Sequence, residues 1–282
     1  FGLGFFYVNK IHSHSIISII KDSMRQEYDL YTAEHHQVWE LMYKEQIEIL
    51  TSRATKTYLQ GIETVQFEDH KIPRFTVINE ALKTLTGWQV YAVPGIIDNK
   101  PFFELLAKKQ FPATTWMRSL AQLKYIEEPD MFHDVFGHVP LLSEPYFAGF
   151  LNGLSQIALE FIESPTAVEL MARIYWYTIE FGLIKEDQTI KIYGAGILSS
   201  PGESIYSLGT EPEHFAFDLD KILGTPYIKD KFQTQYFIAE SYQQLYNSLP
   251  QLKERIQQAV EVGLVIEDGQ KFDFKSLLIN IE

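Results

Sequence analysis

Two histidines, His133 and His138, lie five residues apart in a stretch rich in carboxylates. Five residues of an ideal α-helix turn about 500°, which leaves two side chains roughly 140° apart and unable to converge. Gly137 suggests a solution, because a glycine just past the last helical turn can adopt a left-handed conformation and direct the next residue back over the helix end. Pro140 would keep the helix from resuming. We therefore expect the two imidazoles to share one metal site, with two separate, partly exposed histidines as the alternative.

A third candidate ligand, Glu180, lies within a nearly continuous apolar and aromatic run at residues 174–183. Burying a carboxylate there is costly unless it meets a cation, a donor or a proton. A glutamate that reaches the surface and pairs with Lys185 is the alternative. Two histidines and one carboxylate, without any cysteine, match the ligand set of non-haem Fe(II) oxygenases. The same set could hold zinc for hydrolysis.

Three segments, residues 128–142, 175–183 and 193–203, resemble the signature blocks of the pterin-dependent aromatic amino acid hydroxylases in content, order and spacing. A weaker similarity covers most of the chain from about Gln26. The resemblance implies one Fe(II) held by His133, His138 and Glu180, with O₂ and a tetrahydropterin as the other reactants. It also implies hydroxylation of phenylalanine to tyrosine, as in the bacterial members of the family. Tryptophan or tyrosine as substrate, and a non-catalytic aromatic or pterin binder, are the alternatives.

The resemblance also assigns the cofactor contacts. A short strand at residues 90–93 leads into a loop and then a helix expected to begin at Pro101. Exposed loop backbone followed by an aromatic ring suits a flat heterocycle, which can stack on the ring while main-chain groups bond its edge. The residues that the resemblance assigns to tetrahydropterin binding are Gly95, Ile96, Ile97, Asp98, Asn99, Phe102 and Asp134.

A separate set of residues is expected to bind the substrate. The guanidinium of Arg118 suits bidentate recognition of an amino acid carboxylate, although a surface arginine is the alternative. By resemblance, Arg118 anchors the substrate carboxylate, and Trp176 and Gly196 line the substrate pocket. Ser199 is expected to bond near His133 and the substrate, and thus to orient a metal ligand. Tyr175 is expected beside the metal, where core packing explains it equally well.

The composition limits the classes of function. The chain has 282 residues, of which 46% are hydrophobic and 14% aromatic, which suffices for a large globular domain. Its net charge of −13 disfavours nucleic acid or an anionic membrane as a partner. No apolar run reaches the roughly 18 residues that a membrane-spanning helix needs. We therefore expect a soluble, cytoplasmic protein that binds a small molecule. The C-terminus shows no sustained heptad repeat, so a monomer or weak dimer is expected.

The periodicity predicts a mainly α fold with a few short β-strands (α+β). It forms one catalytic domain at residues 24–282, preceded by an extension of uncertain order at residues 1–23. One long helix is expected from Thr32 to Gly61, since its apolar residues recur at three and four. A hairpin is expected around residues 186–188. Towards the C-terminus we expect a single helix from about Glu240, then a short strand after Gly263.

Overall fold

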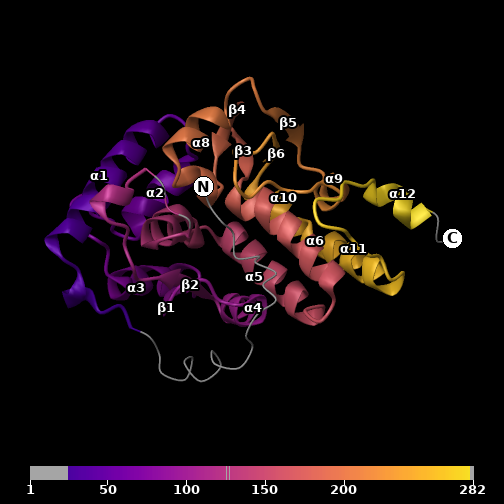
Figure 1. Ribbon diagram of the computed structural model, residues 1–282, viewed down its shortest axis with the longest axis horizontal. Coiled ribbons are helices and arrows are strands. Elements are labelled where there is room, and N and C mark those ends of the chain that lie inside the picture. The colour runs from indigo at the N-terminus through magenta and orange to yellow at the C-terminus, as the bar shows by residue number, and fades with distance from the viewer. Residues whose placement is uncertain (1–24, 125, 127, 280–282) are drawn as a thin grey trace.

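The computed structural model describes residues 25–124, 126 and 128–279; the extension expected at residues 1–23 lies outside them. In this part of the chain helices dominate and the strands are short, which confirms the predicted fold class (Figure 1). The α-helices are α1 (Ala33–Leu50), α2 (Lys56–Thr64), α3 (Phe75–Leu85), α4 (Asn99–Ala107), α5 (Pro145–Glu160), α6 (Pro165–Tyr175), α7 (Ala195–Leu198), α8 (Pro201–Tyr206), α9 (Leu219–Leu223), α10 (Tyr242–Asn247), α11 (Leu249–Glu261) and α12 (Phe274–Ile279).

Shorter helical turns of two other kinds connect these elements. The 3₁₀ turns are η1 (Tyr28–Leu30), η2 (Leu120–Gln122) and η4 (Val139–Ser143), and the π-helical turns are η3 (Phe132–His138) and η5 (Trp176–Glu180). The strands are β1 (Gln89–Val93), β2 (Gln110–Thr114), β3 (Leu183–Glu186), β4 (Thr189–Ile192), β5 (Glu213–Ala216) and β6 (Gln235–Ala239). No helix in the described ranges is both long and apolar enough to cross a bilayer.

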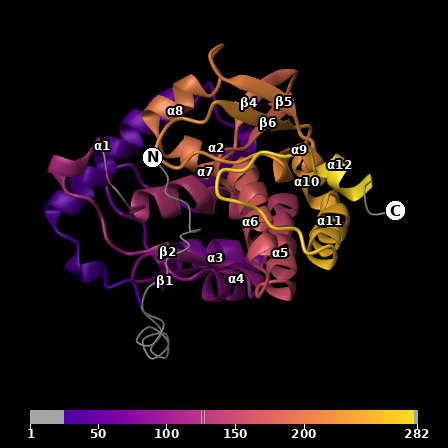
Figure 2. The ribbon, with the colours of Figure 1, turned by 45° about the vertical axis from the view of Figure 1, so that its right-hand side comes forward.

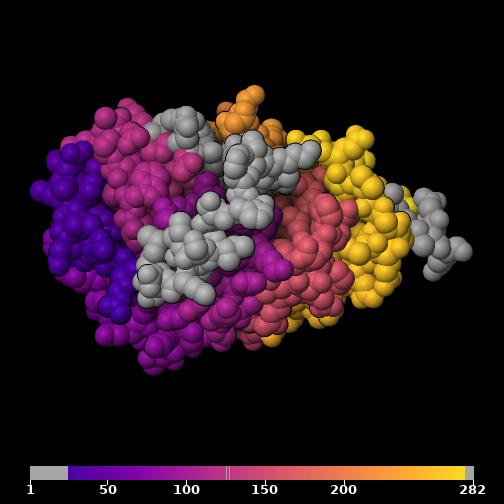
Figure 3. All heavy atoms as spheres, turned by 60° about the horizontal axis from the view of Figure 1, so that its bottom comes forward, coloured from indigo at the N-terminus to yellow at the C-terminus, as the bar shows by residue number. Residues whose placement is uncertain are grey.

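The strands form two separate sheets. β1 and β2 pair in parallel, and the second sheet has the order β4-β3-β6-β5, with β3 and β4 antiparallel and the other pairs parallel. The two sheets lie apart, with the two-stranded sheet low in the view, the four-stranded sheet high in it, and α5 and α6 below the four-stranded sheet (Figure 2). The predicted hairpin between β3 and β4 is confirmed, and positive φ angles at Asp187 and Gln188 suit its two-residue turn. The earliest and latest described segments occupy opposite ends of the molecule (Figure 3).

The prediction of one long helix up to Gly61 is wrong, because the chain breaks between α1 and α2. Thr55 starts the second helix by accepting a hydrogen bond from the backbone N–H of Tyr58 at 3.1 Å. The backbone of residues 53–55 bonds instead to Ile192 at the end of β4, with N–O distances of 2.9 and 3.1 Å. Gly61 lies inside α2, where a Cβ would come within 2.3 Å of the Pro140 carbonyl oxygen. Its role is close packing of α2 on η4.

Two predictions for the C-terminal third are also wrong. The single helix expected from Glu240 is two helices, α10 and α11, because Pro250 in the first turn of α11 starts a new one after Ser248. The strand expected after Gly263 is absent from the described residues, which end in α12. Single contacts hold that segment in place of a ladder: Arg173 donates to the Gln270 carbonyl at 2.9 Å, and the Phe272 N–H donates to Gly224 at 2.9 Å.

Candidate metal centre

The two histidines converge because they lie on a π-helical turn. In η3 the backbone repeat is i→i+5, so a five-residue separation places His133 and His138 on one side of the turn. Their ring centroids are 5.1 Å apart and nearly perpendicular, and both residues are buried. The expected mechanism, a helix end turned back by Gly137, is wrong. Gly137 lies within the turn and lacks the positive φ of Gly87, Gly263 and Gly269.

Gly137 has a packing role instead. A Cβ at this position would lie 2.9 Å from the carbonyl oxygen and 3.1 Å from the side chain of Ala195. The missing side chain therefore lets η3 approach α7, the helix that precedes Ser199. Pro140 does not end the helical path either, since η4 continues it as a 3₁₀ turn with Pro140 in its first positions. Proline is tolerated there because the first N–H groups of a helix have no partner inside it.

A second π-helical turn, η5, carries Glu180 to the same point. Glu180 is completely buried, with Oε1 3.3 Å from Nε2 of His138 and Oε2 3.6 Å from Nε2 of His133. One ligating atom from each residue lies within 4.8 Å of the others. The alternative partner, Lys185, pairs with Glu240. The structure thus brings together the three residues that the sequence indicated.

The charges of the three groups suit a cation. Burial lowers the pKa of His133 to about 4, against the opposing attraction of Glu180, so its imidazole is neutral at neutral pH. Burial alone would raise the pKa of Glu180, but the interactions with His138 and His133 outweigh it and lower the pKa. Among the described residues no hydrogen bond reaches the carboxylate oxygens of Glu180 or the ring nitrogens of His138. Buried acceptors without partners fit a divalent ion better than a closed core.

Ser199 fixes the orientation of one imidazole. Its hydroxyl donates to the Ala195 carbonyl at 2.8 Å and lies 2.9 Å from Nδ1 of His133. Because the single hydroxyl proton is directed at Ala195, the lone pair accepts from Nδ1–H. The basic Nε2 of His133 is then directed towards Glu180. This is the orientation that a metal-ligating histidine requires.

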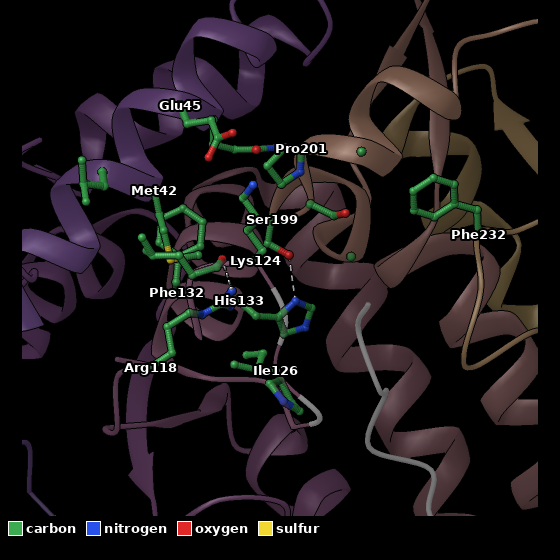
Figure 4. Close-up of a pocket in the computed structure, with 17 residues that line it drawn as sticks. Met42, Glu45, Arg118, Lys124, Ile126, Phe132, His133, Ser199, Pro201 and Phe232 are labelled. Atoms are coloured by element: carbon green, nitrogen blue, oxygen red, sulfur yellow. Dashed lines mark hydrogen bonds between the residues drawn. The ribbon is translucent and has the colours of Figure 1, made fainter. Parts of the chain in front are cut away.

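A cavity of about 410 Å³ opens beside His133 (Figure 4). Its wall includes Met42 on α1, Phe132 and His133 on η3, Gly196 and Ser199 around α7, and Arg118. The chain therefore places two of the residues expected to touch substrate, Gly196 and Ser199, next to a candidate ligand. The contribution of α1 was not expected, since its apolar stripe reads only as core.

Arg118 is held by a partner that the sequence analysis missed. The side chain of Arg118 is 9% exposed, which rules out the surface alternative. Nε donates to Oδ2 of Asp130 at 2.8 Å and Nη2 donates to Oδ1 at 2.9 Å, which forms a bidentate pair. Nη1 donates to the Leu123 carbonyl at 3.3 Å. Among the described residues, Nη1 and Nη2 each keep a further N–H without a partner, so the held guanidinium can still receive a carboxylate.

The aromatic pair Tyr175 and Trp176 is buried near the candidate ligands but does not line the cavity. The Trp176 ring packs between Phe181 and Tyr227, with centroid distances of 4.9 and 4.7 Å. Burial, with smaller effects of Glu180 and Asp134, raises the pKa of Tyr175 well above its usual value. Trp176 thus lies against the segment that follows α9 and outside the described cavity wall, and its contact with substrate stays a prediction.

The residues expected to bind the pterin lie on another side of the ligands. Gly95, Ile96, Ile97 and Asp98 follow β1, Asn99 begins α4, and the buried Phe102 lies 5.8 Å from the Tyr175 ring. The helix thus begins two residues before the predicted Pro101. Asp134 accepts a hydrogen bond from the Thr114 N–H of β2 at 2.8 Å, and burial raises the pKa of this carboxyl well above its usual value. None of these residues is part of the described wall of the cavity, so their cofactor role stays a prediction.

Two imidazoles and a carboxylate on one face match the ligand set of mononuclear non-haem iron proteins. Residues 20–265 match the family described as biopterin-dependent aromatic amino acid hydroxylase, and the chain belongs to this family. It is 43% identical to phenylalanine-4-hydroxylase of Chromobacterium violaceum over 227 residues, which cover 80% of this chain and 76% of the relative.

A solved structure of that bacterial enzyme, with bound iron(III) and 7,8-dihydrobiopterin, matches with a TM-score of 0.79 at 42% identity. The match covers 84% of this chain and 87% of the solved chain. Tyrosine 3-monooxygenase of Rattus norvegicus is less similar, at 32% identity over 89% of this chain and 49% of the relative.

Proposed function

We propose that this chain is a phenylalanine 4-monooxygenase, which converts L-phenylalanine to L-tyrosine with O₂ and a tetrahydropterin at a non-haem Fe(II). The observation that carries the proposal is the convergence of His133, His138 and Glu180 within 4.8 Å beside a cavity that also exposes Arg118. The relatives support phenylalanine over tyrosine as substrate, because the phenylalanine hydroxylase is 43% identical and the tyrosine monooxygenase 32%.

The family of the chain supports iron over hydrolytic zinc, because the similar enzyme of Chromobacterium violaceum has a solved structure with bound iron(III). When bound, Fe(II) supplies the redox chemistry that allows O₂ to react, with the pterin as the source of electrons. Three protein ligands on one face leave the remaining positions of the ion open. Ser199 holds the His133 ring so that Nε2 would be free to bind the ion. All three ligands are buried, and the low polarity of their surroundings strengthens their interaction with a charged ion.

The protein's further contribution is to position the substrate. Arg118, held by Asp130, is proposed to bind the substrate carboxylate through its remaining N–H groups. Gly196, Ser199 and Trp176 are proposed to contact the substrate, the first two along the described wall. Holding the aromatic ring in one orientation beside the ion lowers the entropic part of the barrier.

The pterin is proposed to bind at the loop between β1 and α4, with Phe102 as the stacking ring. The geometry that supports this is the contact of the neighbouring strand β2 with the ligand turn. The Phe111 ring lies 4.8 Å from the His138 ring, and the Thr114 N–H bonds Asp134 at 2.8 Å. Gly95 has open space around it, which leaves its backbone accessible to a ligand. The monomeric or weakly dimeric state and the cytoplasmic location stay predictions.

The test is tyrosine formation from phenylalanine under air, with Fe(II) and tetrahydropterin each omitted in turn. We expect turnover only with both present, and faster than with tryptophan or tyrosine as substrate. Protein reconstituted with Zn(II) should be inactive. Glu180→Ala should abolish activity together with stoichiometric iron binding. Iron-loaded protein that binds phenylalanine without consuming O₂ would show a non-catalytic binder, and faster turnover of tryptophan would replace the proposed substrate.

A further inference from the structure

An amino acid carries two opposite charges, and Arg118 matches only one of them. Held by Asp130, Arg118 supplies the cation for the substrate carboxylate. The ammonium group of the same substrate also needs a partner, because a charged group that leaves water unpaired is strongly disfavoured. The side-chain acceptors on the cavity wall therefore determine where the ammonium group can bind.

Glu45 on α1 is the only carboxylate on the wall that the described residues form. Its side chain is exposed and makes no hydrogen bond or ion pair with another described residue. Figure 4 shows the Glu45 carboxylate extending from α1 into the pocket, with Met42 and Phe132 between it and Arg118 in this view. Glu45 is thus an anionic acceptor on the same cavity as the guanidinium of Arg118.

The hydroxyl groups of the wall are weaker candidates, because both already take part in other bonds. The hydroxyl of Ser199 lies 2.9 Å from Nδ1 of His133. The hydroxyl of Ser200 accepts from the backbone N–H of Glu203 at 3.4 Å. Both are also uncharged, and a carboxylate is a stronger partner for an ammonium group than a neutral hydroxyl.

The residue after Glu45 fixes this part of α1 over the cavity. Gln46 is 1% exposed and donates from Nε2 to the hydroxyl of Ser204 at 2.8 Å, which donates in turn to the Ile197 carbonyl at 2.7 Å. These bonds tie α1 to α8 and α7, which supply other parts of the wall. The buried Oε1 of Gln46 has no partner among the described residues, so the wall has unmet acceptor capacity beside Glu45.

We propose that Glu45 is a substrate-binding residue that accepts the ammonium group of the amino acid, while Arg118 binds its carboxylate. Two separate elements, α1 and the segment after β2, then hold the two charged ends. The cavity thereby selects an α-amino acid over a carboxylic acid with the same ring. The inference deepens the proposed function and rests on it, since it takes the cavity as the substrate site.

The charges on the described wall agree with this assignment. Asp130 compensates the charge of Arg118, which leaves Lys124 and Glu45 as the wall residues with unpaired charges. They have opposite signs, as the two ends of the substrate do. The structure has no ion pair between Lys124 and Glu45, so the carboxylate can meet an incoming cation. Because Glu45 is exposed, water screens the interaction and its contribution to binding is modest.

Equilibrium binding to the iron-loaded protein, without pterin and under anaerobic conditions, tests the proposal. The probes are L-phenylalanine and 3-phenylpropionate, which has the same ring and carboxylate but no ammonium group. In Glu45→Gln the Kd of L-phenylalanine should rise about three- to fivefold. The Kd of 3-phenylpropionate should not rise, because this ligand loses only a repelling charge.

Two further variants and the salt dependence separate charge recognition from a structural role. Glu48→Gln is the matched control, because Glu48 is an exposed glutamate of the same helix outside the described wall. It should bind both probes as the wild type does. Glu45→Asp keeps the charge on a shorter side chain and should retain part of the preference for L-phenylalanine. Raising the ionic strength should narrow the difference between the wild type and Glu45→Gln, since salt screens exposed charges.

The ratio of the two Kd values decides the outcome. A ratio in Glu45→Gln equal to that of the wild type overturns the proposal, whether both values rise together or neither changes. The measurement needs no turnover, so it is separate from the proposed function. Protein that binds L-phenylalanine with the expected dependence on Glu45 but forms no tyrosine would refute the activity and leave ammonium recognition standing. Normal hydroxylation with an unchanged ratio would refute only the role of Glu45.

Discussion

At the scale of single residues, the hydroxyl of Ser199 determines which nitrogen of His133 can meet a metal. Replacing Ser199 with alanine removes the acceptor 2.9 Å from Nδ1, so the imidazole is free to change tautomer and orientation. We expect metal affinity to fall about 10- to 100-fold. Titration of the metal-free protein with Fe(II) under anaerobic conditions measures this. Ser199→Thr retains a hydroxyl and should lose less, and equal affinity of the alanine variant and the wild type would contradict the assigned role.

The residues of the site differ in how far the sequence could predict them. The sequence alone indicates the three candidate ligands, His133, His138 and Glu180. A carboxylate inside an apolar run is unfavourable unless it binds a cation or a donor, and a nearby histidine pair offers such a site. The pairing of Arg118 with Asp130 gives no such signal, since 12 residues separate two ordinary charged side chains. The same is true of Glu203, a buried residue on α8 just after the cavity-lining residues 199–202, whose partners Gln233 and Tyr236 are about 30 residues away. Contacts of this kind depend on the tertiary fold.

At the scale of elements, the most informative wrong prediction concerns the backbone that carries the candidate ligands, which forms the π-helical turns η3 and η5. The five-residue histidine spacing predicts a helix end, because an α-helix cannot align residues i and i+5. A π-helical turn aligns them, but such turns are rare and occur mainly at functional sites. The histidine spacing can be read from the sequence, but the tertiary contacts that favour a π-helical turn over an α-helix cannot. Both turns that supply ligands are of this type, which suggests that ligand geometry and backbone geometry are selected together.

Two other differences between the predicted and the observed elements have local explanations. β2 contains Pro112, which argues against a central strand but is tolerated in a two-stranded sheet where one edge is free of ladder bonds. The break between α1 and α2 was hidden because the apolar period continues through Ala54 to Tyr58. Only the N-cap at Thr55 and the bonds to Ile192 reveal it.

The close packing of η3 on α7 gives a prediction at this scale. Gly137→Ala would place a Cβ 2.9 Å from the backbone oxygen of Ala195. Displacing backbone requires more energy than rotating the end of a flexible side chain. We expect a loss of about 1–3 kcal/mol in the free energy of unfolding, together with weaker metal binding. Denaturant unfolding of the metal-free protein measures the first effect. Gly95→Ala is the control, since nothing lies within 4 Å of the added atom. Equal stability of the two variants would show that η3 tolerates the displacement.

At the scale of the whole molecule, the buried ligand cluster should link metal binding to folding. An ion that binds only the folded chain at 100 times its dissociation constant stabilises it by about 2.7 kcal/mol. For a chain of this size that corresponds to a rise in Tm of about 5–10 °C. Thermal unfolding with and without Fe(II) under anaerobic conditions tests this. Glu180→Gln removes the one charged ligand and should abolish most of the shift. An undiminished shift would place the ion elsewhere.

Glu203 gives the pH dependence of global stability. Its pKa is about 7 in the folded protein and 4.5 in the unfolded chain, so between these values the folded state binds more protons. The contribution of Glu203 to the free energy of unfolding is therefore fully present below about pH 4.5. It is lost as the pH rises through 7, and the loss is at most about 3 kcal/mol. Denaturant unfolding of the wild type and Glu203→Gln from about pH 5 to about pH 8 should show the variant gaining stability relative to the wild type. Equal pH dependence of the two proteins would show that the folded state does not hold the Glu203 carboxyl in its neutral form.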